Sequence, residues 1–267
     1  MAEVIVITSG KGGVGKTTTT ANIGVGLAKR GKKVVLIDTD TGLRNLDLLL
    51  GLERRIVYTL VDVIQKRTTY KRALVRHKKY ETLFLMPTSQ VADKSAIEPE
   101  QMKELIAEMK AEFDYILVDC PAGIEQGFQT AVIAADWAIV VTMPEIAAVR
   151  DADKIIGRLQ NDGKEIKLVV NRIRSQMVKD GTMLDMDAIN DILSLPCIGQ
   201  IPDDEKVIDS ANRGEPVIDN ASSLAGKAYA NVVSRIMGED VPFLEAPNES
   251  FLQRLKNMIL GRGKRDD

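Results

Sequence analysis

The stretch Val-Ile-Val-Ile-Thr-Ser-Gly-Lys-Gly-Gly-Val-Gly-Lys-Thr, residues 4–17, decides the fold of this 267-residue chain. Its first four residues are all β-branched, and an uninterrupted apolar run of this kind is typical of a strand buried on both faces. The run leads into Gly-x-x-x-x-Gly-Lys-Thr over residues 10–17, which is the spacing of a phosphate-binding loop. A helix is expected to follow over about residues 16–29. The order of strand, loop and helix is the context that such a loop requires, so the stretch predicts a nucleotide site.

The chemistry of the loop follows from its residue types. Glycines lack a Cβ, so the backbone can curl and direct successive N–H groups at phosphate oxygens, and the helix N-terminus adds partial positive charge. Lys16 is expected to reach the β- and γ-phosphates, and the Thr17 hydroxyl is expected to ligate Mg²⁺. The candidate nucleotide-binding residues of this segment are Gly10, Lys11, Gly12, Gly13, Val14, Gly15, Lys16, Thr17 and Thr18.

Composition narrows the class of protein. Hydrophobic residues make up 45% and charged residues 28%, as in ordinary globular proteins, and the net charge of −2 provides no global basic field for nucleic acid. The two cysteines, Cys120 and Cys197, form no C-x-x-C, which argues against zinc or iron–sulfur ligation and suits a reducing cytoplasm. No apolar run approaches the ~18 residues of a spanning helix, and the N-terminal residues do not resemble a secretory signal. The single histidine, His77, lies in a basic stretch and is expected at the surface.

Acidic residues end two further apolar runs. The run at residues 33–37 ends in Asp38-Thr39-Asp40, and carboxylates beyond a strand lie where open α/β sheets bind ligands. Asp40 is our candidate for orienting the attacking water, and Asp38 for supporting the water shell of Mg²⁺; the alternative is a pair of turn or capping aspartates. The run at residues 115–118 ends in Asp119, which is placed to hold Mg²⁺ through water.

Strand and helix patterns alternate along the rest of the chain, which predicts an α/β fold with a mainly parallel twisted sheet and helices on both faces. No break in composition divides residues 1–238, so these are expected to form one P-loop NTPase domain. The expected elements are helices over 57–66, 98–113 (capped by Ser95 with Glu98), 146–159 and 224–237, and strands over 83–86, 138–142 and 167–170.

The C-terminal segment has a different character. Residues 239–249 contain prolines and acids and are interpreted as a linker, and Ser250 can cap a helix in the tail, residues 250–267. At 100° per residue its apolar side chains fall within an arc of roughly 120°, which cations border. This pattern predicts a helix that lies on an anionic membrane; the alternative is a helix packed on the domain. The candidate membrane-binding residues are Phe251, Leu252, Arg254, Leu255, Lys256, Met258 and Ile259.

Together these motifs resemble the MinD branch of the MinD/ParA family of deviant P-loop ATPases. The resemblance rests on Lys11 within Lys-Gly-Gly-x-Gly-Lys-Thr, on Asp40-x-Gly42-x-x-Asn45, on Asp119-x-Pro121 and on the tail. It implies that Lys11 reaches across a homodimer to the partner's nucleotide, although spacing alone identifies only an extra cation on the loop. It further implies that adenine is contacted by Asn171, Arg172, Pro202 and Asp203, and that regulatory partners bind Arg150, Asp151, Asp153 and Lys154.

The function implied by the resemblance is that of an ATPase, with ATP and Mg²⁺ as cofactors, in division-site selection. The ATP-bound homodimer would attach to anionic phospholipids on the cytoplasmic face of the inner membrane. There it would recruit MinC, which blocks Z-ring assembly away from midcell, and hydrolysis, stimulated by MinE where it is present, would release the dimer. No specific nucleic acid is expected as a partner.

Other functions remain open at this point. A ParA-type DNA-partition ATPase would share the loop and the acidic motifs but should carry a basic surface in place of the tail. A MinD-like regulator of flagellar number would share the tail as well. An iron–sulfur carrier of the same group would need cluster cysteines that the sequence lacks. A scaffold that binds nucleotide without hydrolysing it is the non-enzymatic alternative.

Overall fold

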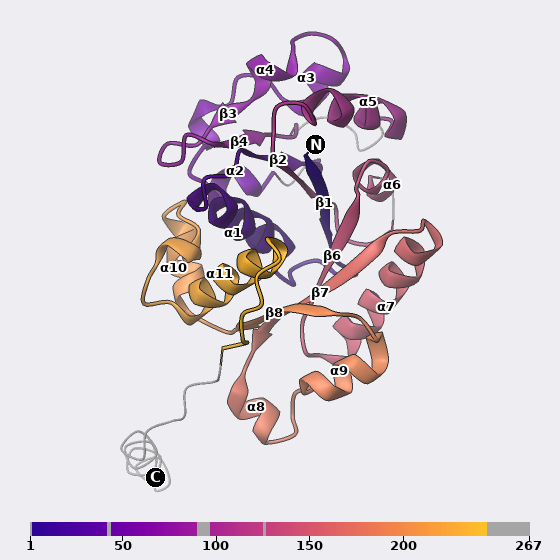
Figure 1. The fold of residues 1–267 in the computed structure, drawn as a ribbon, viewed down its shortest axis with the longest axis vertical. Helices are drawn as coiled ribbons and strands as arrows, with labels where there is room; N and C mark the ends of the chain where they lie inside the picture. The colour runs from indigo at the N-terminus through magenta and orange to yellow at the C-terminus, as the bar shows by residue number, and fades with distance from the viewer. Residues whose placement is uncertain (1, 42–43, 90–96, 125–126, 245–267) are drawn as a thin grey trace, which may run out of the picture.

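The computed structural model describes residues 2–41, 44–89, 97–124 and 127–244, and these build an eight-stranded sheet with helices on both faces (Figure 1). The strands are β1 (Glu3–Thr8), β2 (Val34–Asp38), β3 (Val75–Arg76), β4 (Leu83–Met86), β5 (Tyr115–Asp119), β6 (Trp137–Thr142), β7 (Glu165–Ile173) and β8 (Cys197–Pro202). The α-helices are α1 (Lys16–Lys29), α2 (Leu46–Leu49), α3 (Leu60–Ile64), α4 (Tyr70–Ala73), α5 (Pro99–Met109), α6 (Phe128–Val132), α7 (Ile146–Asn161), α8 (Ser175–Lys179), α9 (Met186–Leu193), α10 (Lys206–Asn212) and α11 (Leu224–Ile236), and the 3₁₀ helices are η1 (Glu53–Arg55) and η3 (Val217–Asp219).

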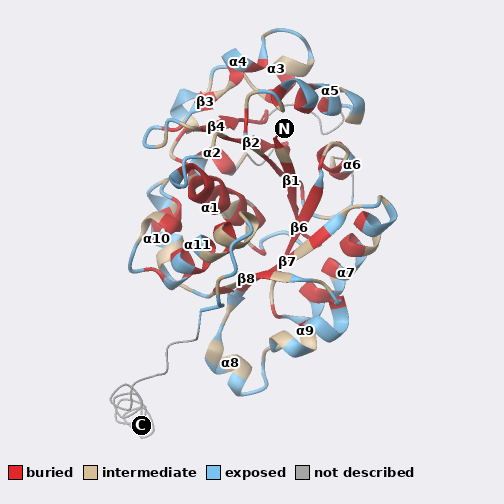
Figure 2. Cartoon of the chain, viewed as in Figure 1, coloured by how far each residue is buried: buried red, intermediate tan, exposed pale blue. Residues whose placement is uncertain are grey.

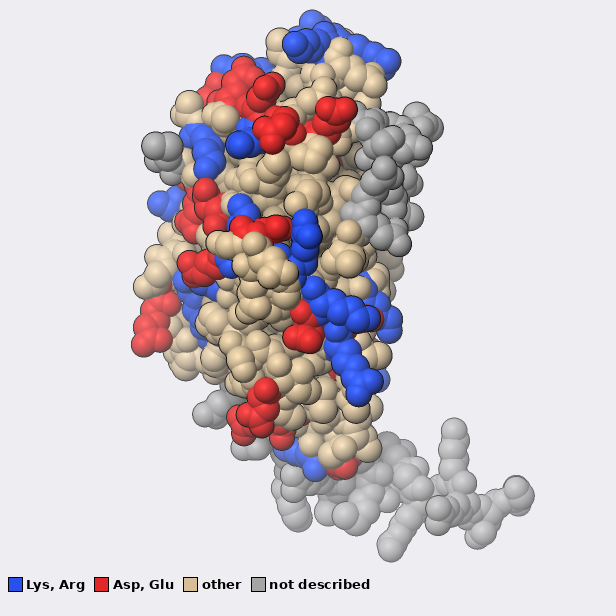
Figure 3. All heavy atoms as spheres, turned by 90° about the vertical axis from the view of Figure 1, so that its right-hand side faces the viewer, with Lys and Arg blue, Asp and Glu red and all other residues tan. Residues whose placement is uncertain are grey.

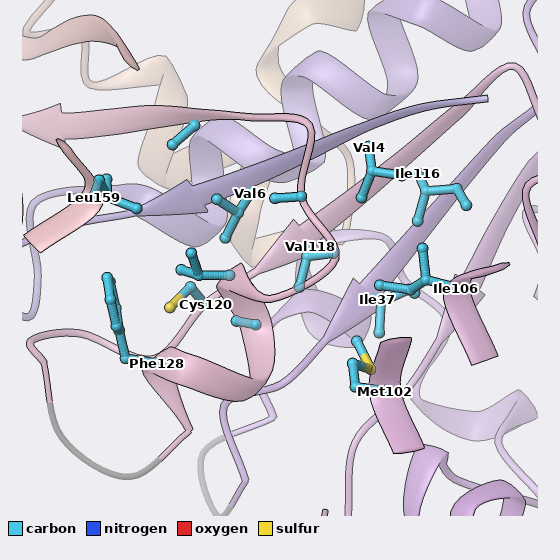
Figure 4. Close-up of a cluster of buried hydrophobic side chains, with 14 of the residues drawn as sticks. Val4, Val6, Ile37, Met102, Ile106, Ile116, Val118, Cys120, Phe128 and Leu159 are labelled. Atoms are coloured by element: carbon cyan, nitrogen blue, oxygen red, sulfur yellow. The ribbon is translucent and has the colours of Figure 1, made fainter. Parts of the chain in front are cut away.

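The strand at residues 4–7 of the sequence is the central strand β1, paired in parallel with β5 on one side and β6 on the other. Its side chains alternate between two hydrophobic clusters, with Val4 and Val6 in one and Ile5 and Ile7 in the other. Figure 4 shows Val4 and Val6 pointing into the cluster that α5 and β5 also supply, and Figure 2 shows the strand buried beyond its first residue. The prediction of a strand buried on both faces is therefore confirmed, because each face of the sheet has its own layer of helices.

The strand order β3-β4-β2-β5-β1-β6-β7-β8 creates the edge at which a ligand can bind. The chain leaves β1 through α1 toward β2 on one side, and returns from β5 across β1 to β6 on the other. This reversal opens a crevice beyond the carboxyl ends of the strands, where α/β sheets bind ligands. The predicted fold class is confirmed. Within the described ranges, the one antiparallel pairing is that of β3 with β4 at the sheet edge.

Helix α1 packs closely against α11, which crosses the same face of the sheet. A Cβ on Gly26 would lie 2.5 Å from Cγ2 of Val233 and 2.7 Å from Cδ1 of Ile218, so only glycine permits this approach. Near the start of α1, the Thr19 hydroxyl lies 3.2 Å from the hydroxyl of Tyr229 in α11, and both side chains are buried. The two helices are thus joined over most of the length of α1.

Three expected elements have different boundaries in the structure. The helix expected over 57–66 begins at Leu60, because Thr59 caps it through hydrogen bonds from its N–H and Oγ1 to Asp62 Oδ2, and Val57 is left 78% exposed. The helix expected over 98–113 ends at Met109, and its cap is the bond from Glu98 N to Gln101 Oε1; Ser95 lies outside the described residues. The strand expected over 167–170 extends to Ile173, with Arg172 in a left-handed conformation at φ 57°.

His77 is not at the surface, so this expectation was wrong. Its side chain is buried, 8% exposed, and it stacks on Tyr80 with 5.3 Å between ring centroids. The backbone turns sharply after His77, and its Nδ1 accepts hydrogen bonds from the N–H groups of Lys79 (3.1 Å) and Tyr80 (3.2 Å). The imidazole thus serves as the acceptor for two backbone donors of this turn. Among the described residues, no helix has the length and apolar character needed to cross a bilayer.

The buried imidazole predicts a pH-dependent loss of stability. Burial lowers the pKa of His77 below its ordinary value of about 6.5. The unfolded chain therefore takes up a proton on acidification from pH 7.5 to 5.5 that the folded chain resists, and stability falls as the pH drops through that range. The loss amounts to up to ~1.4 kcal/mol for each unit by which the pKa is lowered.

Urea unfolding of the wild type and of His77→Gln at pH 7.5 and 5.5 measures this effect. The chain has no other histidine, and the raised pKa of Asp38 contributes equally to both proteins, so the difference between their pH slopes isolates the imidazole. Equal slopes for the two proteins would contradict the prediction.

Candidate active site

The phosphate-binding loop joins β1 to α1 and is open toward the carboxyl edge of the sheet. Gly13 and Gly15 adopt left-handed conformations, at φ 80° and 96°, which glycine tolerates without strain. A Cβ added at Gly12 or Gly13 would meet nothing within 4 Å, and residues 11–13 are exposed. The front of the loop therefore has room for an anion beside its backbone N–H groups.

The back of the loop is tightly supported. A Cβ on Gly10 would lie 2.1 Å from the carbonyl oxygen of Asp151 in α7, and one on Gly15 would lie 2.1 Å from Nδ2 of Asn171 in β7. The Asn171 amide also donates a hydrogen bond of 2.8 Å to the carbonyl oxygen of Val14. Helix α7 and strand β7 thus fix the curvature of the loop from behind, which keeps its N–H groups oriented before a ligand arrives.

Sheet register brings the two predicted metal-site carboxylates together. Strand β5 lies between β1 and β2, so Asp119 stands opposite both Ile7 and Asp38 at the carboxyl ends of the strands. Lys16 Nζ forms an ion pair of 3.0 Å with Asp119 Oδ1, and the Thr20 hydroxyl donates to the same oxygen at 3.0 Å. Lys16 is 6% exposed, Asp38 1% and Asp119 0%, so three ionisable groups share one buried pocket beneath the loop.

The electrostatics of this cluster are unbalanced. Burial, reinforced by the neighbouring Asp119, raises the pKa of Asp38 to about 8. Burial by itself lowers the pKa of Lys16, but the Asp119 carboxylate outweighs it and the pKa is raised. The Oδ2 atoms of Asp38 and Asp119 are both buried without a hydrogen-bond partner among the described residues. The cluster has two carboxyl groups and only one lysine, so an added cation would be stabilised there.

These residues fit a Mg²⁺ ion with a triphosphate. Mg²⁺ prefers oxygen ligands, and both Asp38 and Asp119 have an orphaned carboxylate oxygen here. Lys16 Nζ lies 3.2 Å from the Thr17 hydroxyl and 3.0 Å from Asp119 Oδ1, so it links the hydroxyl to this cluster. A Mg²⁺ ion here would supply the missing positive charge and leave Lys16 to pair with a phosphate. The donor set therefore suits both parts of Mg·ATP.

Two backbone segments approach the cluster from β2 and β5. The Thr39 hydroxyl donates to the Asp119 carbonyl at 2.7 Å, and the Asp40 N–H donates to Asp38 Oδ1 at 3.0 Å. These bonds fix the backbone of residues 39 and 40 beside the two carboxylates, with Asp40 half-buried. On the other side, the N–H of Gly123 donates to the Ser9 carbonyl at 2.9 Å, so the segment after β5 is joined to the start of the loop.

The residues expected around adenine are in two environments. Asn171 is buried and its amide is already bonded to the loop, whereas Arg172 is exposed. Pro202 ends β8 opposite Ile173, and Asp203 Oδ2 accepts a 2.6 Å bond from Arg174 Nε. All four lie at the carboxyl ends of β7 and β8, and their contact with adenine stays a prediction.

The residues expected to bind partners lie on α7, next to the loop. Arg150, Asp153 and Lys154 are exposed, and Lys154 forms a 3.1 Å ion pair with the half-buried Asp151. Acidic and basic side chains are interspersed on the face that includes α7 (Figure 3). Because the Asp151 carbonyl also packs on Gly10, a partner on this helix would contact an element that supports the loop. The predicted membrane-binding residues 251–259, and Gly42, lie outside the described residues.

Sequence reasoning missed three supports of the site: the Thr20 hydroxyl, the Asp151 carbonyl and the Asn171 bond to Val14. The run of four threonines at residues 17–20 was a signal for the first, since a helix turn places Thr20 one turn after Lys16. The other two join segments more than 130 residues apart, and no local pattern encodes such contacts.

Comparison with known proteins agrees with this geometry. The family model of the CobQ/CobB/MinD/ParA nucleotide binding domain matches residues 5–217. The septum site-determining protein MinD of Synechocystis is 52% identical over 265 residues, which span 98% of this chain and 100% of that protein. The chain belongs to the MinD family. Among solved structures, a chain of the MinC:MinD cell division protein complex of Aquifex aeolicus is similar with a TM-score of 0.86 and 50% identity, covering 91% of this chain and 99% of that one.

Membership of the MinD family confirms the predicted enzyme class, an ATPase that uses ATP and Mg²⁺. The septum site-determining protein MinD of Pyrococcus horikoshii, solved as a complex with Mg-ADP, is 30% identical, has a TM-score of 0.80 and covers 88% of this chain and 96% of that one. The family is one of cell-division proteins, which agrees with the predicted cellular process.

Because the loop is supported from behind, alanine is expected to destabilise the protein at one of its glycines and to have little effect at another. Gly10→Ala forces a Cβ against the Asp151 carbonyl at 2.1 Å, so α7 must shift, and we expect a loss of about 1–3 kcal/mol in unfolding free energy. Gly12→Ala meets nothing within 4 Å and serves as the matched control, with an effect within about 0.5 kcal/mol. Urea unfolding of the ligand-free proteins separates the two; equal stability would refute a tight contact between loop and α7.

Proposed function

We propose that this protein is the ATP-controlled membrane switch of division-site selection. Its ATP-bound homodimer attaches to the cytoplasmic face of the inner membrane, recruits the division inhibitor MinC and so blocks Z-ring assembly away from midcell; hydrolysis releases it. The observation that carries this role is the 50% identity, over 99% of that chain, to a chain of the MinC:MinD complex of Aquifex aeolicus. The buried cluster of Lys16, Asp38 and Asp119 beneath an open loop supports the ATP-dependent part.

The residues of the cluster have separate tasks in hydrolysis. Thr17, Asp38 and Asp119 would hold Mg²⁺, which when bound would neutralise charge on the phosphates. Lys16 exchanges its contact with Asp119 for one with the phosphates. Asp40, whose backbone N–H is bonded to Asp38 Oδ1, orients the attacking water. Phosphoryl transfer depends mainly on such positioning and on electrostatic stabilisation.

Lys11 supplies the link to dimerisation. It lies on the exposed front of the loop, away from the buried Lys16, and so is accessible to a second molecule. A cation presented there can pair with the phosphates bound by a partner, which would make ATP itself part of the dimer interface. ATP binding then controls the oligomeric state.

The tail converts dimerisation into membrane attachment. In this proposal residues 1–238 are the ATPase domain, 239–249 the linker and 250–267 the membrane-targeting tail. A helix of ~10 residues is below the 12–15 at which isolated helices become stable in water, so one tail binds weakly. Two tails on one dimer make the second insertion intramolecular and raise avidity by ~10²–10⁴. Hydrolysis separates the tails and releases the protein.

Partner binding is assigned to the exposed residues of α7, Arg150, Asp153 and Lys154, with Asp151 beside them. MinC is the partner supported by the relative solved in a MinC:MinD complex, and MinE is proposed where it is present.

A ParA-type role in DNA partition is less well supported, because the net charge is −2 and acids and bases are interspersed on the α7 face (Figure 3). A flagellar-number regulator remains the closest functional alternative, and MinC binding discriminates against it.

Replacing Asp40 tests the proposed water-positioning role. Asp40→Ala and the isosteric Asp40→Asn should bind ATP and dimerise, yet hydrolyse ATP on the order of 10²-fold more slowly, because the charge that orients water is lost. Steady-state phosphate release with vesicles measures hydrolysis, and light scattering measures the dimer. A variant that is monomeric and free of ATP would assign Asp40 to binding instead.

Deleting residues 250–267 tests the tail. The truncated protein should bind ATP normally but no longer sediment with anionic vesicles, whereas the full chain should sediment with ATP and far less with ADP. Lys16→Gln in the full chain is the matched control, since its tail is intact and its nucleotide site is not. Vesicle binding by the truncated protein would show that another surface holds the membrane.

A further inference from the structure

The first residues of the proposed linker are held on the ATPase domain. We call residues 239–243 the strap. Arg30, at the end of α1, pairs with Glu239, and the Glu239 N–H donates 2.9 Å to the Ser234 carbonyl of α11. Asn231 Nδ2 donates 3.2 Å to the Pro242 carbonyl. The strap therefore does not begin as a free tether.

Arg235 is the central anchor of the strap. Its Nη2 donates 2.9 Å to the Val241 carbonyl, and its guanidinium lies 3.9 Å from the ring centroid of Phe243. Its Nη1 donates 2.9 Å to the Ile198 carbonyl in β8, so the same side chain ties the strap to the sheet. Hydrogen bonds from a charged guanidinium are stronger than neutral ones, so the bond to Val241 and the cation–π contact with Phe243 together favour the docked strap over a free one.

The anchors belong to the two helices that are coupled to the nucleotide site. Helix α1 begins at Lys16 and ends beside Arg30, a rise of about 21 Å at 1.5 Å per residue. Helix α11 contacts α1 through Tyr229 and Thr19 near the loop and through Val233 against Gly26 farther along. The strap is thus fixed to the body that holds the nucleotide, through helices rather than through loops.

We propose that the strap fixes the origin of the membrane tail relative to the nucleotide site, so that the two tails of an ATP-bound dimer leave it at a set separation. This inference rests on the proposed function and deepens it. With the strap docked, six residues of the proposed linker, 244–249, separate it from the proposed tail; with the strap free, all eleven residues, 239–249, do. Effective concentration falls roughly as the −3/2 power of tether length, so releasing the strap should weaken bivalent attachment by about 2.5-fold.

The test releases the strap while keeping the tail and the site. In Arg30→Ala/Asn231→Ala/Phe243→Ala, three anchors are lost, and Arg235 is retained because it also holds β8. Arg213→Ala, an exposed cation beyond α10, is the matched control. Each protein is sedimented with phosphatidylglycerol-containing vesicles in Mg·ATP and in Mg·ADP, and hydrogen exchange of the Glu239 amide, which donates to the Ser234 carbonyl in the docked strap, reports whether the strap is released.

We expect faster exchange in the triple variant, about 2.5-fold more lipid for half-maximal binding in ATP, and no change in ADP, where each molecule inserts one tail. Inserting six Gly/Ser residues after Leu244 should give a similar loss with the strap intact. Vesicle binding equal to wild type despite faster exchange, an equal loss in ADP, or unchanged exchange would each overturn the role of the strap. Vesicle binding that survives deletion of residues 250–267 would instead refute the proposed function, so the two failures are distinguishable.

Discussion

The ion pair between Lys16 and Asp119 is the interaction on which the site depends, since both side chains are almost fully buried and only 3.0 Å separates them. Burying one charge without the other is unfavourable by several kcal/mol, so neither residue can leave the pair unless something replaces its partner. A phosphate can replace Asp119 for the lysine, and Mg²⁺ can replace Lys16 for the two carboxylates. Nucleotide and metal are therefore expected to favour each other's binding at this site.

The pair lies where it does because β1 and β5 are neighbours in the middle of the sheet. Helices cover both faces of the sheet here and exclude water. Asp38, which ends β2 next to β5, is therefore buried beside Asp119, and its pKa is raised to about 8. Helix α1 connects the ion pair to the strap. It starts at Lys16, packs along α11 and ends next to Arg30, which pairs with Glu239 at the start of the strap. Helices α1 and α11 thus link the phosphate-binding site to the segment from which the tail departs.

Much of the fold was readable from local patterns, and the exceptions have physical reasons. The buried strands of β-branched residues were found because a two-sided strand is continuously apolar. The short helices α8 and α10 were missed, since five and seven residues carry too little periodicity. The surface position expected for His77 rested on its basic neighbours in the sequence. Its side chain is instead buried, and its Nδ1 accepts hydrogen bonds from the backbone N–H groups of Lys79 and Tyr80. The extension of β7 through Asn171 depends on β8, which pairs with it.

The sequence by itself determined the chemistry of this protein: a glycine loop before a helix, Lys16 and Thr17 at fixed spacing, and aspartates at the ends of apolar strands. These features are local, because the spacing of residues along one strand or helix settles which groups can bind phosphate or metal. Only the tertiary structure decided which of them meet. The register that sets Asp38 opposite Asp119, the carbonyl of Asp151 behind Gly10, and the ion pair of Arg30 with Glu239 all join segments distant in the chain. Such contacts arise from the packing of whole layers, which no window of sequence contains.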